Sequence, residues 1–344
     1  MRMRCGRSCG NTHKSRATNC SPDCERGANY ARDVEIILTV PISSLTSVII
    51  VAADSGVTLE GCVTQVFASD AAFELIIADN ASTDGAVQRL QQRYADDPCV
   101  HILRNEKNLG FGPACNLAAR EARGDALLFL NPDCFIAPDS IARLRALLAQ
   151  NTDAGVLGVC ICEPDGNPAR AIRRRDPLLR RALMTLSGLS RWESRWPALQ
   201  GIEMPAPATT QDDVVENVEA VSGALMLLPR EVFERLDGFD AEYFLHCEDL
   251  DLCRRARDAG YRVLFAGDVR VTHTQGSSSR HRPVFVARHK HHGMWRWFRK
   301  FDPAARNPLL RALVWCGIWL HFSLRVPQLS WRGWRARQRG ETQR

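Results

Sequence analysis

The chain has 344 residues, 45% of them hydrophobic, which is enough to bury a full core in one large domain or two small ones. Its formal net charge is +6, and the excess is local: 15 of the 45 Lys and Arg residues, but only 2 of the 39 Asp and Glu residues, lie from Arg280 onward. The best apolar stretch, Ala312 to Leu324, is shorter than the roughly 20 residues that a spanning helix needs. We therefore expect a globular body with a basic tail that lies on a membrane rather than crossing it.

Residues 1–45 are predicted to form a disordered extension, because their first two thirds are polar, rich in Arg, Ser and Asn, and lack an apolar face. Cys5, Cys9, Cys20 and Cys24 form two C-x3-C pairs, whose spacing also permits a small zinc site. No uninterrupted apolar segment occurs before Val34, so we expect no secretory signal, a cytoplasmic location and mostly reduced cysteines.

From Ser47 onward, apolar runs of strand length alternate with amphipathic helical segments. Strands are predicted at 47–52, 74–78, 100–103 and 126–130, and helices at 58–67, 86–94 and 113–123. Continuous apolar runs indicate parallel strands buried on both faces, so the pattern predicts a doubly wound α/β sheet with ligands at the carboxyl ends of its strands. No G-x-G-x-x-G follows the first strand, which argues against an NAD-dependent oxidoreductase.

The regular alternation stops after a further strand that ends near Cys162. Residues 163–216 mix Arg runs, Pro and short helical pieces, and we interpret them as an inserted, partly mobile segment that serves substrate or acceptor binding. Order is expected to return with an apolar run at 218–228, a helix from Arg230, and strands at 262–265 and 269–272.

Polar clusters follow the second and fourth predicted strands. The second strand ends in Asp79-Asn80-Ala81-Ser82-Thr83-Asp84, and the fourth in Asn131-Pro132-Asp133. An Asp at a strand end can bind ribose hydroxyls or a base N–H, and a second one can hold a divalent cation on a diphosphate. Each cluster alone could equally be an Asx turn or a helix cap.

A third cluster, His246 to Asp251, places the carboxylates of Glu248, Asp249 and Asp251 where a strand-like segment turns into a helix. Carboxylates there complement the helix dipole and cap free N–H groups. Their mutual repulsion could also raise the pKa of one of them to a value suited to proton transfer, or be relieved by a cation. The residues alone leave both interpretations open.

Six motifs in this order resemble those of the inverting family 2 glycosyltransferases of the GT-A fold, especially bacterial rhamnosyltransferase-like members. The motifs are DNASTDG (79–85), NLGFGPACN (108–116), LNPDC (130–134), SGALMLLPREVFERLDGFDAEYF (222–244), HCEDLDLCRRARDAGYRV (246–263) and HTQGSSS (273–279). The resemblance covers roughly residues 47–299. It implies a Rossmann-like, mostly parallel sheet with flanking helices. It also implies transfer of a sugar, a deoxyhexose such as rhamnose among the candidates, from a nucleotide-diphosphate donor to an acceptor hydroxyl with inversion.

The resemblance assigns roles on the donor side of the site. Asp79 matches the nucleoside-binding Asp of the family, and Asp133 matches the metal-binding Asp of a DxD-type motif, with Asn131 in place of the first Asp. His273 matches a histidine that approaches the metal or the diphosphate in some relatives. A divalent cation, Mg²⁺ or Mn²⁺, is therefore expected. Asn131 removes one negative charge from the motif, so the resemblance does not establish how tightly this cation is held.

Small and amide residues complete the predicted binding site. Asn108, Gly110 and Asn116 match the loop and helix start beside the donor, and Gly223 and Ala224 are expected to shape the acceptor side, where small residues allow close approach.

Catalysis is assigned by the resemblance to the acidic run. Asp249 matches the usual general base of the family, Glu248 is the alternative, and Asp251 is expected to support the helix. The first strand departs from the family, because Ala52-Ala53-Asp54 replaces an Asn-Tyr-Asn-like sequence. Either Asp54 substitutes for the missing contact to the base, or the donor preference differs.

The C-terminal region, residues 300–344, is predicted to form amphipathic helices on an anionic membrane surface. Six of the eight Trp residues lie among basic residues at this end: Trp295, Trp297, Trp315, Trp319, Trp331 and Trp334. A nucleic-acid-binding tail would carry the same charge, but no nucleic-acid motif accompanies it, and no nucleic-acid partner is expected.

The sequence thus predicts three parts: the extension 1–45, a glycosyltransferase domain 46–299 containing the variable segment 163–216, and the tail 300–344. We expect a peripheral enzyme on the cytoplasmic face of the inner membrane that builds a surface polysaccharide on a lipid-linked or glycan acceptor. The alternative is a non-catalytic nucleotide-sugar or nucleic-acid binding module with a degenerate GT-A fold.

Overall fold

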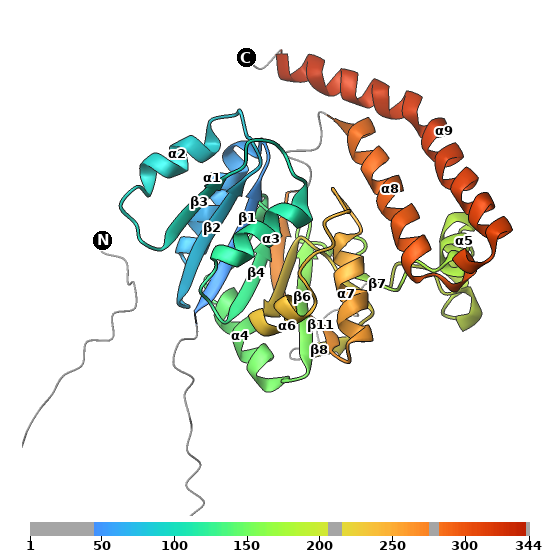
Figure 1. Ribbon diagram of the computed structural model, residues 1–344, viewed down its shortest axis with the longest axis horizontal. Helices are drawn as coiled ribbons and strands as arrows, with labels where there is room; N and C mark the ends of the chain where they lie inside the picture. The colour runs from blue at the N-terminus through green and yellow to red at the C-terminus, as the bar shows by residue number, and fades with distance from the viewer. Residues whose placement is uncertain (1–44, 206–214, 275–281, 342–344) are drawn as a thin grey trace, which may run out of the picture.

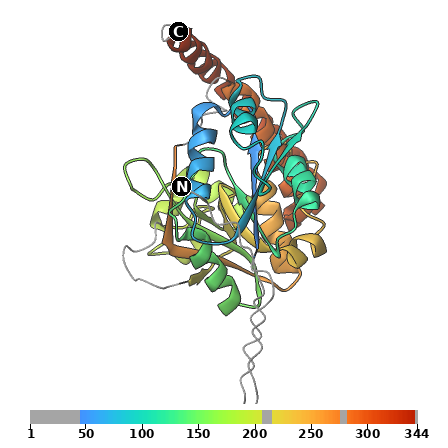
Figure 2. The same ribbon diagram turned by 90° about the vertical axis from the view of Figure 1, so that its left-hand side faces the viewer.

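The computed structural model describes residues 45–205, 215–274 and 282–341. The predicted N-terminal extension and its two cysteine pairs lie outside the described residues. In the described part, a central mixed sheet carries helices on both faces, and two long helices follow at the C-terminal end (Figure 1). Figure 2 views the sheet nearly edge-on, with α1 (Gly56–Phe67) on one side and α3 (Phe111–Glu121) on the other.

The first four strands lie where the apolar runs predicted them. They are β1 (Thr46–Ala52), β2 (Phe73–Asp79), β3 (Val100–Arg104) and β4 (Ala126–Leu130). They pair in parallel in the order β3-β2-β1-β4, so their carboxyl ends meet at one edge of the sheet. Every residue of β1 and β4 is buried, which explains why these runs are apolar throughout rather than alternating.

The second half of the sheet is mixed. Its strands are β5 (Cys134–Phe135), β6 (Ala154–Cys162), β8 (Val215–Asn217), β10 (Leu225–Pro229) and β11 (Arg262–His273). β10 runs antiparallel between β4 and β6, and β11 lies parallel to β6 and antiparallel to β5 and β8. The apolar run at 218–228 was predicted as one ordered piece, but it contains two short strands, β9 (Ala220–Val221) and β10, separated by the turn at Gly223.

The prediction of two separate strands at 262–265 and 269–272 is wrong. They form one strand, β11, with an irregular register: Ala266 faces Val159 of β6, while Arg270 faces the next residue, Cys160. The residues between Ala266 and Arg270 are therefore a bulge, which in sequence resembles a turn because it contains Gly and Asp.

The remaining helices connect or cover these strands: α2 (Ala86–Arg93), α4 (Ser140–Gln150), α5 (Leu179–Ser187), α6 (Arg230–Arg235), α7 (Glu248–Asp258), α8 (Pro283–Phe301) and α9 (Pro308–Glu341). α7 packs against β6 and β11, and α3 against β1 and β2. These two helices therefore bring the acidic run and the 108–116 loop to the same edge of the sheet as the ends of β2 and β4.

The part of the segment 163–216 that is described has structure of its own. It contains β7 (Arg173–Arg174), α5 and two short 3-10 helices, Leu189–Trp192 and Pro197–Leu199. β7 pairs with β9 in a small antiparallel sheet. Asp176 forms ion pairs with Arg254 and Arg257 of α7. These ion pairs attach the segment to the helix that carries the acidic run.

α8 belongs to the globular body. Trp297 is fully buried, so its interpretation as a membrane-surface residue is wrong. Arg296 and Lys300 form ion pairs with Asp240, and a Cβ added to Gly293 would lie 2.6 Å from the carbonyl oxygen of His246. The helix is thus packed directly against the turn that precedes the acidic run.

α9 is longer than the apolar stretch suggested. It continues over 34 residues through Pro327, and within the described part of the chain it is the one helix long and apolar enough to cross a membrane, by length and composition alone. The prediction that this region is too short to span was therefore wrong in length. Figures 1 and 2 show α9 alongside α8 and then extending past the rest of the protein. None of the most apolar 18-residue window of α9 is buried.

Candidate functional site

The loop after β2 is organised by its own side chains. Oδ1 of the buried Asp79 accepts a hydrogen bond of 2.9 Å from the N–H of Ser82, three residues further along the chain. Asn80 donates to the carbonyl of Gly110 at 3.0 Å and accepts from Asn105 at 2.8 Å. An Asx turn does occur at the end of the cluster, where Oδ1 of Asp84 accepts a hydrogen bond from the N–H of Ala86, two residues on, at 3.0 Å. The hydrogen bond from Ser82 holds the side chain of Asp79 at the carboxyl end of β2.

Asp54, the residue that departs from the family pattern, faces the same loop. Its Oδ1 accepts hydrogen bonds from the N–H and the hydroxyl of Thr83 at 2.7 and 3.1 Å, and its own N–H donates to Ser82. The backbone of Asp54 is left-handed, with φ 53°. Asp54 therefore ties the end of β1 to the end of β2.

The loop that is predicted to lie beside the sugar donor, which contains Asn108 and Gly110, packs closely against Phe244, just before the acidic run. Gly110 has φ 91°, and a Cβ there would overlap the carbonyl oxygen of Phe244, which accepts a hydrogen bond of 2.9 Å from the N–H of Phe111. Oδ1 of Asn108 accepts from the N–H of Gly110 at 2.9 Å. Gly110 is therefore required by the backbone, and Asn108 stabilises its turn.

Asn116 lies further along α3, and its side chain forms hydrogen bonds with the backbone of a single residue, Phe239. Its amide donates to the carbonyl of Phe239 at 2.7 Å and accepts from the N–H of Phe239 at 2.8 Å. These contacts give Asn116 a role in holding the 238–239 segment against α3. A direct contact with a donor remains a prediction.

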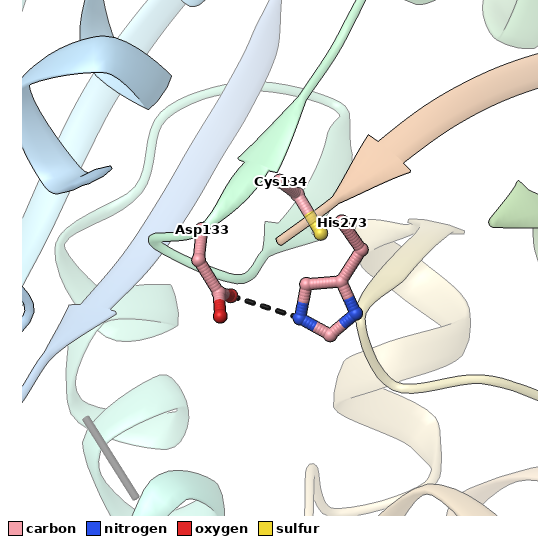
Figure 3. Close-up of side chains that lie close together, drawn as sticks. All are labelled: Asp133, Cys134 and His273. Carbon is pink, nitrogen blue, oxygen red and sulfur yellow. Dashed lines mark hydrogen bonds and ion pairs between the residues drawn. The ribbon is translucent and has the colours of Figure 1, made fainter. Parts of the chain in front are cut away.

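Asp133 and His273 are brought together by the pairing of β5 with β11. His273 pairs with Cys134 in the antiparallel register, and its Nε2 lies 2.9 Å from Oδ1 of Asp133 (Figure 3). Thr274 completes the junction, because its N–H donates to the carbonyl of Asp133 at 3.0 Å. Two predicted metal ligands that are 140 residues apart thus lie side by side.

Cys134 is part of the same group, in which one possible ligand atom from each residue lies within 4.8 Å of the others. Its thiol is buried and donates to the carbonyl of Ala224 at 3.5 Å, and burial holds the pKa of Cys134 well above its usual value. A metal ligand would have to be the thiolate, a soft donor, whereas Mg²⁺ and Mn²⁺ prefer hard oxygen donors such as carboxylates. The pair Asp133 and His273 therefore fits the expected cation, and Cys134 does not.

The predicted acceptor-side residues link the two halves of the site. The N–H of Gly223 donates to Oδ2 of Asp249 at 3.0 Å, and the carbonyl of Ala224 accepts from the N–H of Asn131 at 2.9 Å. A path of two residues therefore connects the acidic run with the Asn131–Asp133 turn.

Asp249 begins α7 together with Glu248, after a turn in which His246 and Cys247 both have positive φ. Besides Gly223, Asp249 accepts from the N–H of Leu250 at 2.8 Å and forms an ion pair with Arg174. Burial alone would raise the pKa of Asp249, but the charge and hydrogen bond of Arg174 outweigh it, and the pKa lies below its usual value. Asp249 is thus ionised at neutral pH, as a proton acceptor must be.

Glu248 is in the opposite state. Burial, followed by the charge of Asp249, raises the pKa of Glu248 to about 8. Its Oε2 has no hydrogen-bond partner among the described residues. Glu248 is therefore mostly protonated at neutral pH, which favours Asp249 as the candidate base, as the motif suggested.

Asp251 supports the structure, as expected. It is fully buried and forms ion pairs with Arg255 at 2.5 Å and with Lys300 of α8 at 2.6 Å. The three carboxylates of the acidic run thus have three different environments.

Sequence reasoning missed Arg174, which lies in the segment 163–216 and reaches Asp249 across 75 positions. The Arg run at 173–175 was the available signal, but nothing in it distinguishes the residue that faces the site from its neighbours. Arg173 pairs with Glu216 instead, and Arg175 with Glu193.

Residues 47–236, more than half of the chain, match the sequence model of Glycosyl transferase family 2. The chain is also 30% identical over 269 residues to N-acetylglucosaminyl-diphospho-decaprenol L-rhamnosyltransferase of Mycobacterium tuberculosis, covering 71% of this chain and 85% of that protein. Rhamnosyltransferase WbbL of Escherichia coli is 25% identical over 215 residues, which cover 60% of this chain and 74% of WbbL.

Among solved structures, the mannosyltransferase PcManGT of Pyrobaculum calidifontis in complex with GDP-Man and Mn²⁺ superimposes with a TM-score of 0.52. It is 18% identical, and the match covers 85% of this chain and 74% of PcManGT. At that identity the likeness shows the fold, which is GT-A. The chain belongs to glycosyl transferase family 2, and it is a sugar-transferring enzyme of that fold.

Proposed function

We propose that this protein is an inverting, metal-dependent glycosyltransferase that moves a sugar from a nucleotide-diphosphate donor to the hydroxyl of a lipid-linked acceptor. The observation that carries the proposal is the two-residue path from Asp249 through Gly223 and Ala224 to Asn131. It joins an ionised carboxylate to the turn that bears Asp133, so the proposed proton acceptor and the proposed diphosphate-binding group lie on connected elements.

In the proposed reaction, Asp79 accepts hydrogen bonds from the nucleoside, as a strand-end Asp does in nucleotide-binding α/β folds. Asp133 and His273 would hold Mn²⁺ or Mg²⁺, which when bound supplies positive charge to the departing diphosphate. Asp249 takes the proton of the acceptor hydroxyl while that oxygen forms its bond to the anomeric carbon. The bond to the diphosphate breaks in the same step on the opposite face, so the configuration inverts and no covalent enzyme intermediate is needed.

The relatives support the choice of substrates. Two are named as rhamnosyltransferases, and the name of one specifies an acceptor that joins N-acetylglucosamine to decaprenol through a diphosphate. We extend this to a deoxyhexose donor and a lipid-diphosphate acceptor for the present chain, in the synthesis of a cell-envelope polysaccharide.

α9 supports a location at the membrane surface. Many of its large apolar side chains are exposed, as are the Arg residues beside them; the exposed apolar residues are Leu309, Leu310, Leu313, Trp315, Leu320, Leu324, Trp331 and Trp334. Exposed Trp and Leu beside Arg suit the headgroup region of an anionic bilayer. We therefore place the enzyme on the cytoplasmic face of the inner membrane, where a lipid-linked acceptor would be presented.

The test is a transfer assay with the full chain, a panel of nucleotide-diphosphate sugars that includes a rhamnose donor, and N-acetylglucosaminyl-diphospho-polyprenol as acceptor. We expect product only with Mn²⁺ or Mg²⁺ present, and an anomeric configuration opposite to that of the donor by NMR. Absence of both transfer and donor binding across the panel would reject the proposal and favour a non-catalytic module.

A further inference from the structure

We propose that Arg174 is a positioning residue for the catalytic carboxylate, so that the segment 163–205 supplies part of the machinery that activates the acceptor. The inference rests on the proposed function, in which Asp249 is the base. It adds a residue that lies outside all six motifs and comes from the variable part of the chain.

The contacts of Arg174 define its role. Its Nη2 donates to Oδ2 of Asp249 and also to the carbonyl of Val221 at 2.7 Å. Because Gly223 donates to the same Oδ2, this oxygen already accepts two hydrogen bonds. Two donors on one oxygen fix the plane of the carboxylate as well as its position.

Oδ1 of Asp249 is different, because its single hydrogen bond in the described structure comes from the N–H of Leu250. A carboxylate oxygen can accept two hydrogen bonds, so Oδ1 keeps one acceptor position. The acceptor hydroxyl would bind there, and Arg174 determines where that position points by holding Oδ2.

The ion pair is enclosed, which makes its geometry specific. The side chains of Arg174 and Asp249 are 16% and 12% exposed. A buried charge pair is costly to separate, because either partner alone would remain in a poorly solvated place. Other titratable groups near Asp249 in the described residues include Glu248 and Cys253 on α7 and His246 and Cys247 in the turn before it, and Lys290 of α8 acts on that turn. In the described part of the chain, Arg174 is therefore the cation directly bonded to this carboxylate.

The backbone of Arg174 is fixed from two sides. β7 pairs with β9, with Arg174 opposite Ala220, and Val221 leads directly into the Gly223 turn. Just beyond β7, Asp176 is held by Arg254 and Arg257 of α7. The cation and the carboxylate therefore sit on elements that are themselves joined, which keeps their relative position constant.

The decisive variants are Arg174→Ala and Arg174→Lys, with Arg175→Ala as the matched control. Arg175 belongs to the same segment and is equally enclosed, but it bonds to Glu193 and Gly201 rather than to Asp249. We expect Arg174→Ala to lower kcat about 100-fold, the effect of a misplaced reacting group. Binding of UDP, dTDP or GDP with Mn²⁺ should be unchanged, because the nucleotide site is built from other elements.

The pH dependence of kcat distinguishes a positioning role of Arg174 from a general loss of folded structure. Without the guanidinium, the acid limb of the kcat profile should move to higher pH, because the proton on Asp249 is lost less readily. Arg174→Lys should keep the wild-type limb and recover part of kcat, and added guanidinium ion should partly rescue Arg174→Ala. Arg175→Ala should show the wild-type kcat and limb.

Wild-type kcat and an unmoved acid limb in Arg174→Ala would overturn the inference. If that variant does not fold, Arg174→Gln, which keeps much of the length of the side chain but not its charge, carries the test, and wild-type kcat with an unmoved acid limb there has the same meaning. Asp249→Asn distinguishes the two levels of the proposal. An active Asp249→Asn enzyme contradicts the base assignment itself, whereas an inactive one beside a fully active Arg174→Ala contradicts only the role of Arg174.

Discussion

The backbone of Gly223 lies directly against the side chain of Asp249. The N–H of Gly223 donates a hydrogen bond of 3.0 Å to Oδ2 of Asp249, and a Cβ added to Gly223 would lie 3.1 Å from the Cβ of Asp249. A side chain at position 223 would make Asp249 shift by a few tenths of an ångström. The turn between β9 and β10 is thus shaped around the candidate base, although the two residues lie 26 positions apart.

Replacement of Asp249 by Asn is expected to lower kcat by about 10³-fold, within the range that general base catalysis contributes. The amide keeps the size of the side chain but cannot take a proton. Steady-state transfer and calorimetric binding of the nucleotide with Mn²⁺ measure the two effects, and binding should survive. Asp258→Asn, at the exposed end of the same helix, serves as the control. Near-wild-type turnover of Asp249→Asn would transfer the assignment to Glu248.

Glu248 makes stability depend on pH. The unfolded chain loses this proton near the ordinary value of 4.5, whereas the folded protein holds it up to about 8. Between these values unfolding releases a proton, so the free energy of unfolding falls as the pH rises. Glu248→Gln removes that dependence and should reduce the difference in stability between pH 5 and pH 8.5, by up to about 4 kcal/mol. Urea unfolding at the two pH values tests this, and an unchanged difference would contradict the raised pKa.

Gly110→Ala should destabilise the fold strongly, because the new Cβ meets the backbone of Phe244 and the φ of 91° is strained for Ala. We expect a loss of more than about 3 kcal/mol in urea unfolding. Gly260 is the matched control, since its φ is 90° and nothing lies within 4 Å of its Cβ position. Gly260→Ala should cost only about 1 kcal/mol, the price of the backbone conformation. Equal losses of stability in the two variants would show that the backbone at Phe244 moves to make room for the added Cβ at little cost in free energy.

Removal of the divalent cation with EDTA should abolish transfer, and Mn²⁺ should restore it. His273→Ala should raise the Mn²⁺ concentration needed for half-maximal activity by about 10-fold or more, because one of two protein ligands is lost. Cys134→Ser is the comparison, since its buried thiol is not expected to bind the cation. A normal Mn²⁺ requirement in His273→Ala would leave Asp133 as the protein ligand and give His273 another role.

Truncation after Asn307 should remove membrane binding while leaving the catalytic body folded. The shorter chain lacks α9 but keeps Trp297 and the ion pairs of Lys300 with Asp240 and Asp251. We expect the full chain, but not the truncated one, to pellet with liposomes that contain anionic lipid, with similar Tm values for both. Truncation after Arg299 would instead remove Lys300 and should lower the Tm. Pelleting of the chain that ends at Asn307 would place the lipid contact elsewhere.

The first half of the sheet could be predicted from sequence because β1, β2 and β4 are almost wholly buried and therefore appear as continuous apolar runs, while β3, the half-buried edge strand, still carries three apolar residues. The role of Asp251 was also predictable, since its position one turn before Arg255 permits an ion pair on the same helix. β11 was misread because a bulge and a turn use the same residues. Trp297 was misread because a buried and a membrane-bound Trp cannot be distinguished by composition.

The contact between Arg174 and Asp249 could not be predicted, for a physical reason. It depends on β7 and β9, strands of two residues each, whose pairing leaves no periodic pattern in the sequence. Neighbouring Arg173 and Arg175 have the same chemistry and face other partners, so only the register of β7 selects which guanidinium reaches the carboxylate.

The pairing of β5 with β11 has a consequence for synthesis on the ribosome. Asp133 is made early, but His273 belongs to the last strand of the sheet, and loop closure over 140 residues must precede their contact. A nascent chain that has completed β1 to β5 contains Asp79 and Asp133, yet it lacks both His273, the second proposed metal ligand, and the acidic helix α7. The emerging enzyme therefore stays unable to consume an activated sugar until nearly all of the sheet has been translated.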